Sequence, residues 1–219
     1  MCIRDRSPTE RAHLRAHFGI GADELVVVFL GLLAAHQGIA HLIEAAARLK
    51  AAGRQVRWLV MGYPGAECWQ RAAADAGVQE DVIFTGRVPY ANAPRMLALG
   101  DIAIAPKLSL TEGSGKILNY MAMGLPTVAF DTPAQREYLG SLGVYAPVGD
   151  SAALAQGVAD LLDRPALRRA LGERLRRVAV QQFGWDRAAA TLLTVYRQLL
   201  SHTQPTPAQR PQRQDKRVL

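Results

Sequence analysis

The residues best suited to chemistry form the segment 106–116, where glycine and serine lead into a segment of helical periodicity that carries Lys116. Glycines let backbone N–H groups approach a ligand closely. A helix that begins near Ser114 would add unpaired N–H groups and the positive end of its dipole, and the Lys116 ammonium adds a full charge. This pattern indicates a phosphate site, although a tight turn with a solvated lysine fits the spacing equally well. The segment is not a Walker A loop, because Ile117 stands where that motif needs Ser or Thr.

Six short runs of apolar and β-branched residues must position this segment. They span residues 25–30, 56–61, 82–85, 102–105, 127–130 and 144–146. Because each run is apolar along its length, rather than at alternate positions, it predicts a strand that is buried on both faces. Helical segments separate the runs, so the sequence predicts a three-layer α/β domain with a parallel sheet of about six strands. Ligands of such a sheet bind beyond the carboxyl ends of the strands, where segment 106–116 follows the fourth run.

Helical periodicity predicts five helices between the strands and three after the last strand. The first five span about 39–49, 65–76, 92–99, 114–123 and 133–139, and the last three span 151–162, 165–183 and 186–201. The predicted buried stripe of the last helix consists of Leu192, Val195, Tyr196 and Leu199. Near the N-terminus, Ser7, Pro8 and Glu10 form a capping-box pattern, which predicts a short helix to about Phe18.

The net charge of +7 and the pI near 9.8 raise the question of a nucleic-acid partner. Residues 1–17 carry a net +2 and residues 203–219 a net +3, which leaves +2 for the other 185 residues. The charge therefore predicts no basic face, and nucleic acid is not an expected partner. No apolar run is long enough to span a membrane, no secretory signal is visible, and two cysteines make no disulfide framework, so a cytoplasmic location is expected.

The two ends of the chain have their own compositions. Residues 1–6 look like translated adapter sequence, which predicts a non-native leader on a fragment, with an ordinary disordered N-terminus as the alternative. Residues 203–219 are rich in Gln, Pro and Arg and almost free of apolar side chains, so we expect them to be disordered.

Residues 115–128 read Gly-Lys-Ile-Leu-Asn-Tyr-Met-Ala-Met-Gly-Leu-Pro-Thr-Val, which resembles the donor-site signature of retaining glycosyltransferases of family 4. Other stretches agree with that family in order and spacing. They are residues 29–45, 58–62, 82–88, 100–106, 149–150 and 183–185. The resemblance covers about residues 20–200. It implies a Rossmann-like domain that is the C-terminal half of a GT-B fold, in which two such domains face each other across a cleft.

The resemblance also implies a domain organisation and a reaction. Residues 7–19 would be an interdomain-linker helix and residues 20–202 the domain that binds a nucleotide-sugar donor. The reaction would be retaining transfer of a hexose from a nucleoside diphosphate sugar to an acceptor hydroxyl, in the synthesis of glycans, cell-envelope polysaccharides or glycolipids. No cofactor or metal is expected. An acceptor glycan or lipid would bind to a missing N-terminal domain, without which the chain would be inactive.

The resemblance assigns a catalytic role to Lys116, which would stabilise the leaving diphosphate, and to Glu112, which would approach the donor sugar. The full set of predicted donor-binding residues is Gly31, Gly62, Gly86, Arg87, Val88, Lys107, Gly113, Ser114, Gly115, Lys116 and Asn119. Asn119 stands where the family has a Glu that binds the ribose hydroxyls. Only six residues, instead of seven, separate it from Glu112, which weakens the assignment of that carboxylate.

A further departure concerns the positive charges of the predicted phosphate site. Leu32 and Gln37 stand where the family often has an Arg and a Lys that contact the diphosphate. Lys116 would then be the main fixed positive charge, with Lys107 and Arg87 as candidate replacements. Two alternatives stay open: a non-catalytic nucleotide-binding α/β module, which the departures at Leu32, Gln37 and Asn119 favour, and an epimerase or phosphorylase with the GT-B fold. The basic face of the helix at 165–183 suits either solvent or an anionic lipid surface, which would place the protein at the inner face of the plasma membrane.

Overall fold

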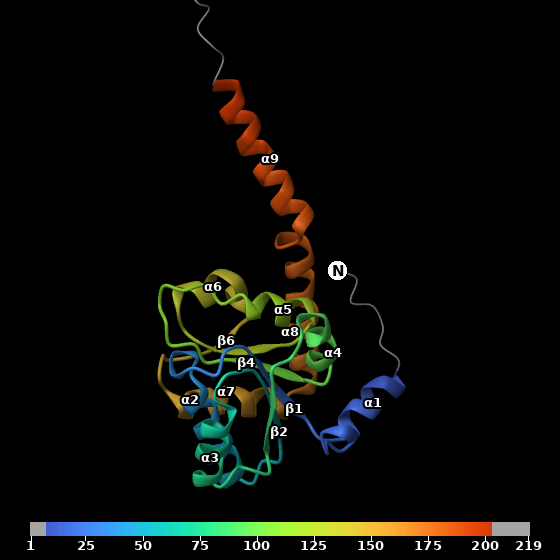
Figure 1. Cartoon of the computed structure of the whole chain (residues 1–219), viewed down its shortest axis with the longest axis vertical. Coiled ribbons are helices and arrows are strands. Elements are labelled where there is room, and N and C mark those ends of the chain that lie inside the picture. Colours follow the sequence, from blue (N-terminus) through green and yellow to red (C-terminus); the bar gives the residue numbers. More distant parts are fainter. Residues whose placement is uncertain (1–7, 203–219) are drawn as a thin grey trace, which may run out of the picture. The chain divides into compact units, whose positions relative to one another are not determined.

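The computed structural model describes residues 8–202 of the 219-residue chain. The predicted leader at 1–6, the capping residue Ser7 and the predicted tail at 203–219 lie outside the described residues. Two compact units are distinguished, one ending at Gln181 and one beginning at Gln182. The first contains the sheet, and the second contains the last helix (Figure 1). The predicted domain limits at 19 and 202 stay predictions.

All six predicted strands form, and they make one parallel sheet. They are β1 Val26–Leu30, β2 Arg57–Met61, β3 Val82–Gly86, β4 Ile102–Ala105, β5 Thr127–Phe130 and β6 Val144–Ala146. Their order in the sheet is β3-β2-β1-β4-β5-β6, and every neighbouring pair is parallel. The order reverses between β1 and β4, and such a switch point is where ligands bind in a doubly wound sheet.

Helices cover both faces of the sheet, as the continuous apolar strands require. Alternate residues of β1 point to opposite faces: Val27 and Phe29 join one core cluster, and Val26 and Val28 join the other. The first cluster packs against α2 Ile39–Ala51, α3 Ala66–Asp75 and α7 Ser151–Asp163. The second packs against α1 Pro8–His17, α4 Ala93–Leu97, α5 Lys116–Ala122, α6 Pro133–Leu139 and α8 Pro165–Gln182. The predicted three-layer α/β class is confirmed.

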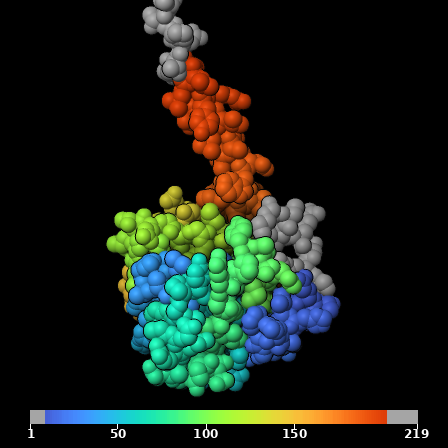
Figure 2. Space-filling view, in the orientation of Figure 1, coloured from blue at the N-terminus to red at the C-terminus, as the bar shows by residue number. Residues whose placement is uncertain are grey.

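The first helix, α1, is fixed to the amino-terminal side of the domain by its arginines. Arg15 is buried, and its guanidinium donates to the carbonyl oxygens of Gly21 and Glu24, each at 2.5 Å. Figure 2 shows α1, in dark blue, against the green part of the chain around residue 98, where Arg11 donates to the Ala98 carbonyl oxygen at 3.0 Å. The short helix that the capping box predicts is thus present and tied to this unit.

The last helix, α9 Trp185–His202, forms where periodicity predicts it, but its apolar stripe is not buried. Among the described residues, Leu192, Val195, Tyr196 and Leu199 are between 44% and 61% exposed. These values describe the helix within its own unit, so burial of the stripe against another unit or domain stays a prediction. Periodicity shows that a helix has an apolar face, and it carries no information on what covers that face.

Candidate functional site

Three predicted glycines lie side by side at the carboxyl ends of neighbouring strands: Gly31 and Gly62 follow β1 and β2, and Gly86 is the last residue of β3. The Gly31 N–H donates to the Met61 carbonyl oxygen at 3.0 Å, and the Gly62 N–H donates to the Gly86 carbonyl oxygen at 3.0 Å. A Cβ atom at Gly62 would collide with the Gly31 carbonyl oxygen. Because Gly62 has no side chain, the backbone segments that follow neighbouring strands can stay in contact past the end of the sheet. The missing side chain also lets a ligand approach this backbone closely.

The Lys116 ammonium lies in the same region, between the segments that follow β1 and β4. Its Nζ donates to Oε1 of Gln37 at 2.7 Å and lies 4.0 Å from the centre of the Phe29 ring. A Cβ atom at Gly31 would come within 2.8 Å of Nζ, so this glycine leaves the space that the ammonium occupies. The structure therefore joins Gly31, Gln37 and Lys116, although 79 positions separate the last two in the sequence.

The Lys116 ammonium has a pKa close to neutral pH. Burial, together with the smaller effect of the positive charge of Lys107, lowers the pKa of this ammonium to about 7. The Gln37 carbonyl supplies a neutral acceptor where a carboxylate would have kept the pKa high. An arriving anion would provide the missing negative charge and favour the protonated form.

Lys107 and Glu112 form a pair within the same loop. Lys107 is only 5% exposed, and its Nζ lies 2.8 Å from Oε2 of Glu112 and donates to the Gly113 carbonyl oxygen at 2.9 Å. The hydrogen bond and the charge of Lys107 lower the pKa of the exposed Glu112 carboxyl, and His36 acts in the same direction. Glu112 is therefore an ionised carboxylate that is already paired.

The backbone before α5 supplies free donors. Ile117 and Leu118 donate their N–H groups to the carbonyl oxygens of Ser114 and Gly115, which closes the first turn. The helix begins at Lys116, two residues later than expected, so residues 113–115 belong to the loop. Among the described residues, no backbone carbonyl oxygen accepts a hydrogen bond from the N–H groups of these three residues. Ser114 is 2% exposed, and its Oγ has no partner within the described chain.

The other predicted residues lie on neighbouring elements. Asn119 is half-buried on α5. Arg87 is exposed at the end of β3, where its guanidinium lies 5.2 Å from the centre of the Tyr63 ring, and Val88 packs against the core. Leu32 is exposed. No contact among the described residues links Arg87 to Lys116, whereas the charge of Lys107 acts on Lys116.

Sequence reasoning missed one polar contact that holds the site together. The buried hydroxyl of Tyr120, on α5, accepts a hydrogen bond from the Leu30 N–H at 2.8 Å, at the end of β1. Burial raises the pKa of Tyr120, which keeps the hydroxyl neutral. A tyrosine on the apolar face of a helix is usual for a core residue, so no signal in the sequence could have identified this bond.

Tyr120→Phe should lower the free energy of unfolding by about 1–3 kcal/mol, because the half-buried Leu30 N–H then loses its acceptor. Chemical denaturation at pH 7 measures this loss. Tyr90→Phe is the matched control, since Tyr90 is 76% exposed and should change stability by less than about 0.5 kcal/mol. Equal stabilities of the two variants would contradict the role given to the Tyr120 hydroxyl.

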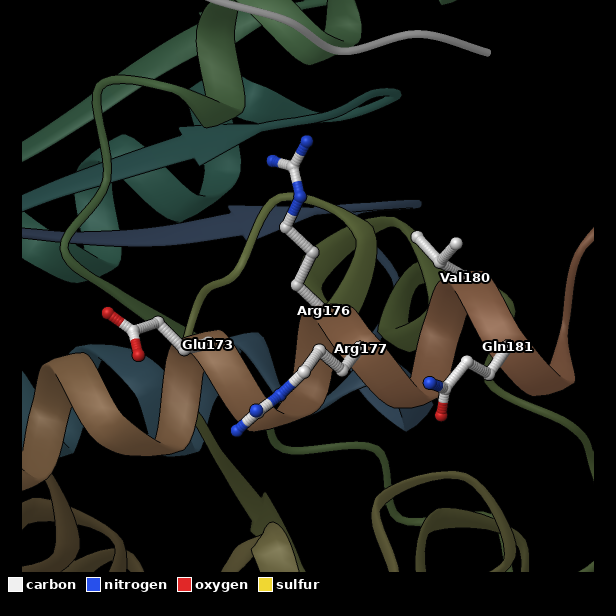
Figure 3. A pocket seen from close by; sticks show the side chains of 5 residues that line it. All are labelled: Glu173, Arg176, Arg177, Val180 and Gln181. Atoms are coloured by element: carbon white, nitrogen blue, oxygen red, sulfur yellow. The ribbon is translucent and has the colours of Figure 1, made fainter.

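Three other features of the structure bear on function. The part of the chain from 8 to 202 contains no group of three His, Cys, Asp or Glu side chains that could hold a metal ion. No described helix is both long and apolar enough to cross a membrane. A hollow of about 420 Å³ is lined by Glu173, Arg176, Arg177, Val180 and Gln181 of α8 (Figure 3). It contains none of the predicted site residues, so it is not the candidate site.

Comparisons with known proteins agree with this arrangement. Residues 24–164 match the family model of the group 1 glycosyl transferases. The chain is 30% identical over 193 residues to the alpha-D-kanosaminyltransferase of Streptomyces kanamyceticus. The matched region covers 86% of this chain and 49% of the relative. It is 31% identical over 194 residues to a GDP-mannose-dependent phosphatidylinositol monomannoside mannosyltransferase of Mycolicibacterium smegmatis, covering 84% and 50%.

Solved structures give the same result at the level of the fold. The sucrose-phosphate synthase of Thermosynechococcus elongatus matches with a TM-score of 0.77 at 25% identity, over 88% of this chain and 49% of that one. Anabaena HepE in complex with UDP-glucose matches with a TM-score of 0.76 at 21% identity, over 90% and 54%. The predicted Rossmann-like domain of a GT-B fold is confirmed, and the chain spans about half the length of the relatives it matches. The chain belongs to the group 1 glycosyl transferases.

Proposed function

We propose that this chain is the donor-binding half of a retaining hexosyltransferase of family 4. The whole enzyme would move a hexose from a nucleoside diphosphate sugar to an acceptor hydroxyl, in glycan, polysaccharide or glycolipid synthesis. Family membership supports glycosyl transfer, and relatives named as glycosyltransferases support it further. Complexes of a structural neighbour with UDP and with UDP-glucose support a nucleotide-sugar donor.

The observation that carries the proposal is the poised ammonium of Lys116 at the switch point of the sheet. Lys116 and the free N–H groups of residues 113–115 together suit a diphosphate, whose charge increases as the sugar leaves. Asn119 would bond a ribose hydroxyl without a charge of its own, and Glu112 would face the sugar. Val88 and Arg87, at the end of β3, would contact the nucleobase, and Gly31, Gly62 and Gly86 would allow its close approach.

A non-catalytic nucleotide-binding module is the second candidate, and one observation favours it. Gln37 occupies the hydrogen-bonding position next to Lys116, and Leu32 is exposed, so two expected cations are absent from the described site. A module of this kind would bind a diphosphate without stabilising a leaving group strongly. The acceptor, glycan or lipid, would be bound by residues outside this chain in the first case and would not exist in the second.

Titration calorimetry with UDP, GDP and ADP, followed by a radiolabelled-sugar transfer assay, tests the proposal. We expect the chain to bind one of these diphosphates and to transfer no sugar alone, whereas the same residues joined to an N-terminal Rossmann-like domain transfer it. Failure to bind any of the three contradicts the donor-binding role. Transfer by residues 7–202 alone contradicts the division between two halves, and a joined protein that binds without transfer supports the non-catalytic module.

The pH dependence of binding follows from Lys116. Its pKa of about 7 in the free protein should rise when a diphosphate binds, so binding takes up a proton above pH 7. Affinity should therefore fall between pH 7 and 9, by up to about tenfold per pH unit, and it should be highest below pH 7. Calorimetry in buffers of different ionisation enthalpy measures the uptake directly. An affinity that is flat from pH 7 to 9 would contradict the role of Lys116.

The proposed location is the cytoplasm, where nucleotide sugars are used, with contact between the basic face of α8 and the inner face of the plasma membrane. The exposed arginines of that face include Arg169, Arg174 and Arg177. Flotation with vesicles of anionic and of neutral lipid tests the contact, and equal recovery on both would contradict it.

A further inference from the structure

The Lys107–Glu112 pair differs from the contacts expected of a phosphate-binding lysine. Lys107 directs its ammonium at Oε2 of Glu112 (2.8 Å) and at the Gly113 carbonyl oxygen (2.9 Å), so two of its three protons serve its own loop. We propose that Lys107 is a positioning residue, which fixes the Glu112 carboxylate and neutralises it beside the diphosphate site, rather than a ligand of the phosphate. This inference rests on the proposed function.

The surroundings of Lys107 hold it in that position. Its side chain is 6% exposed, whereas that of Glu112 is 61% exposed, so a buried lysine holds a carboxylate that lies at the surface. The adjacent backbone is tied to the segment after β1, because the Leu108 N–H donates to the His36 carbonyl oxygen at 3.0 Å. The bonds of Lys107 to Glu112 and Gly113 thus close the loop 107–113, and the Leu108–His36 hydrogen bond ties this loop to the segment after β1. A lysine whose ammonium is held in this way is not free to turn toward a bound phosphate.

The charges of Lys107 and Glu112 determine how the pair affects the binding of an anionic ligand. The loop of the pair lies beside the cation of the proposed diphosphate site, because Gln37 accepts from Lys116 while the neighbouring His36 carbonyl oxygen accepts from the Leu108 N–H. The charge of Lys107 accordingly lowers the pKa of Lys116. An unpaired carboxylate at that place would repel a diphosphate, and an unpaired ammonium would attract it. The two groups together carry no net charge. Glu112 is therefore tolerated beside an anionic ligand only because Lys107 neutralises it.

A double-mutant cycle separates this role from direct phosphate contact. The affinities to be measured are those of the wild type, Lys107→Met, Glu112→Gln and the double variant for the nucleoside diphosphate that the wild type binds best among UDP, GDP and ADP, at pH 6.5. We expect Lys107→Met to weaken binding about tenfold and Glu112→Gln to tighten it about two- to fivefold. The double variant, which restores the neutral pair, should bind within about threefold of the wild type.

Other results would overturn the inference. Direct contact between Lys107 and phosphate predicts that the double variant stays as weak as Lys107→Met, and unchanged affinity in Lys107→Met would show that the pair has no role. Lys50→Met is the matched control, because Lys50 makes the same two bonds, to Asp81 at 2.8 Å and to the Gly77 carbonyl oxygen at 2.9 Å, on other elements. It should leave affinity unchanged.

The melting temperature of every variant shows whether a change in affinity comes from a loss of folded protein. If Lys107→Met does not fold, Lys107→Gln replaces it in the cycle, since it removes the charge and keeps a polar end in the loop. Recovery of affinity in the double variant without recovery of the melting temperature supports a role through Glu112. A wild-type chain that binds none of the three diphosphates contradicts the proposed function itself, and this inference with it.

Discussion

Lys116→Met should weaken nucleoside diphosphate binding by about 10- to 100-fold at pH 6.5. At that pH most Lys116 side chains carry a proton, because the pKa is about 7. Hydrogen bonds between an ammonium and a phosphate contribute about 1.5–3 kcal/mol each, and the methionine keeps the length of the stem while it removes every donor. Titration calorimetry gives the ratio of dissociation constants. Lys50→Met, which removes a lysine from another part of the domain, is the control.

The same substitution has an effect on stability whose sign is fixed by linkage. The folded-state pKa of Lys116 lies below the unfolded value, so between about pH 7 and pH 10 the unfolded chain binds more protons. Wild-type stability should therefore rise with pH relative to Lys116→Met, by about 1–2 kcal/mol between pH 7 and pH 9. Denaturation curves of both proteins at the two pH values measure this difference. Equal changes in the unfolding free energy of the two proteins between pH 7 and pH 9 would contradict the lowered pKa of Lys116.

Gly38→Ala should destabilise the domain by about 3 kcal/mol or more. Gly38 stands before α2 with φ of 78°, a conformation that costs an L-residue about 1 kcal/mol. A Cβ atom there would also collide with the Pro106 carbonyl oxygen, which is backbone and can move only with the loop that carries Lys107. The segments after β1 and β4 would separate, so diphosphate affinity should fall together with stability.

Gly65→Ala separates the collision from the backbone strain. Gly65 stands before α3 with φ of 77° and ψ of 27°, nearly the values of Gly38, but a Cβ atom there would meet nothing within 4 Å. Its substitution should cost only about 1 kcal/mol. The difference between the two unfolding free energies is the cost of the collision with Pro106. Equal losses would mean that the segments after β1 and β4 are not in close contact.

Much of the scaffold could be predicted because its signals are local. Each of the six apolar runs became a strand with limits that shifted by one residue at most, since burial on both faces leaves a continuous apolar run in the sequence. The glycines after the strands and the residues 115–128 likewise indicated where a ligand would bind. A parallel sheet brings the carboxyl ends of its strands to one edge, so the loops of the site followed from the strands.

The partners of the polar side chains could not be predicted in this way. Gln37 and Lys116 are 79 positions apart and Tyr120 and Leu30 are 90 apart, and no periodicity relates such pairs. The start of α5 was also misplaced by two residues, because helix ends depend on which N–H groups find acceptors. The apolar face of α9 had a visible period, but its exposure depends on contacts between elements.

The sequence by itself determined the α/β class and the family, and it predicted the edge of the sheet where a ligand would bind, because apolar patterns and a contiguous motif are properties of the chain. The tertiary structure decided the charge of the site. It placed the neutral Gln37 side chain against the half-buried Lys116 and paired Lys107 with Glu112. Protonation and ion pairing depend on burial and on distances of a few ångströms between segments, and those quantities exist only once the chain has folded.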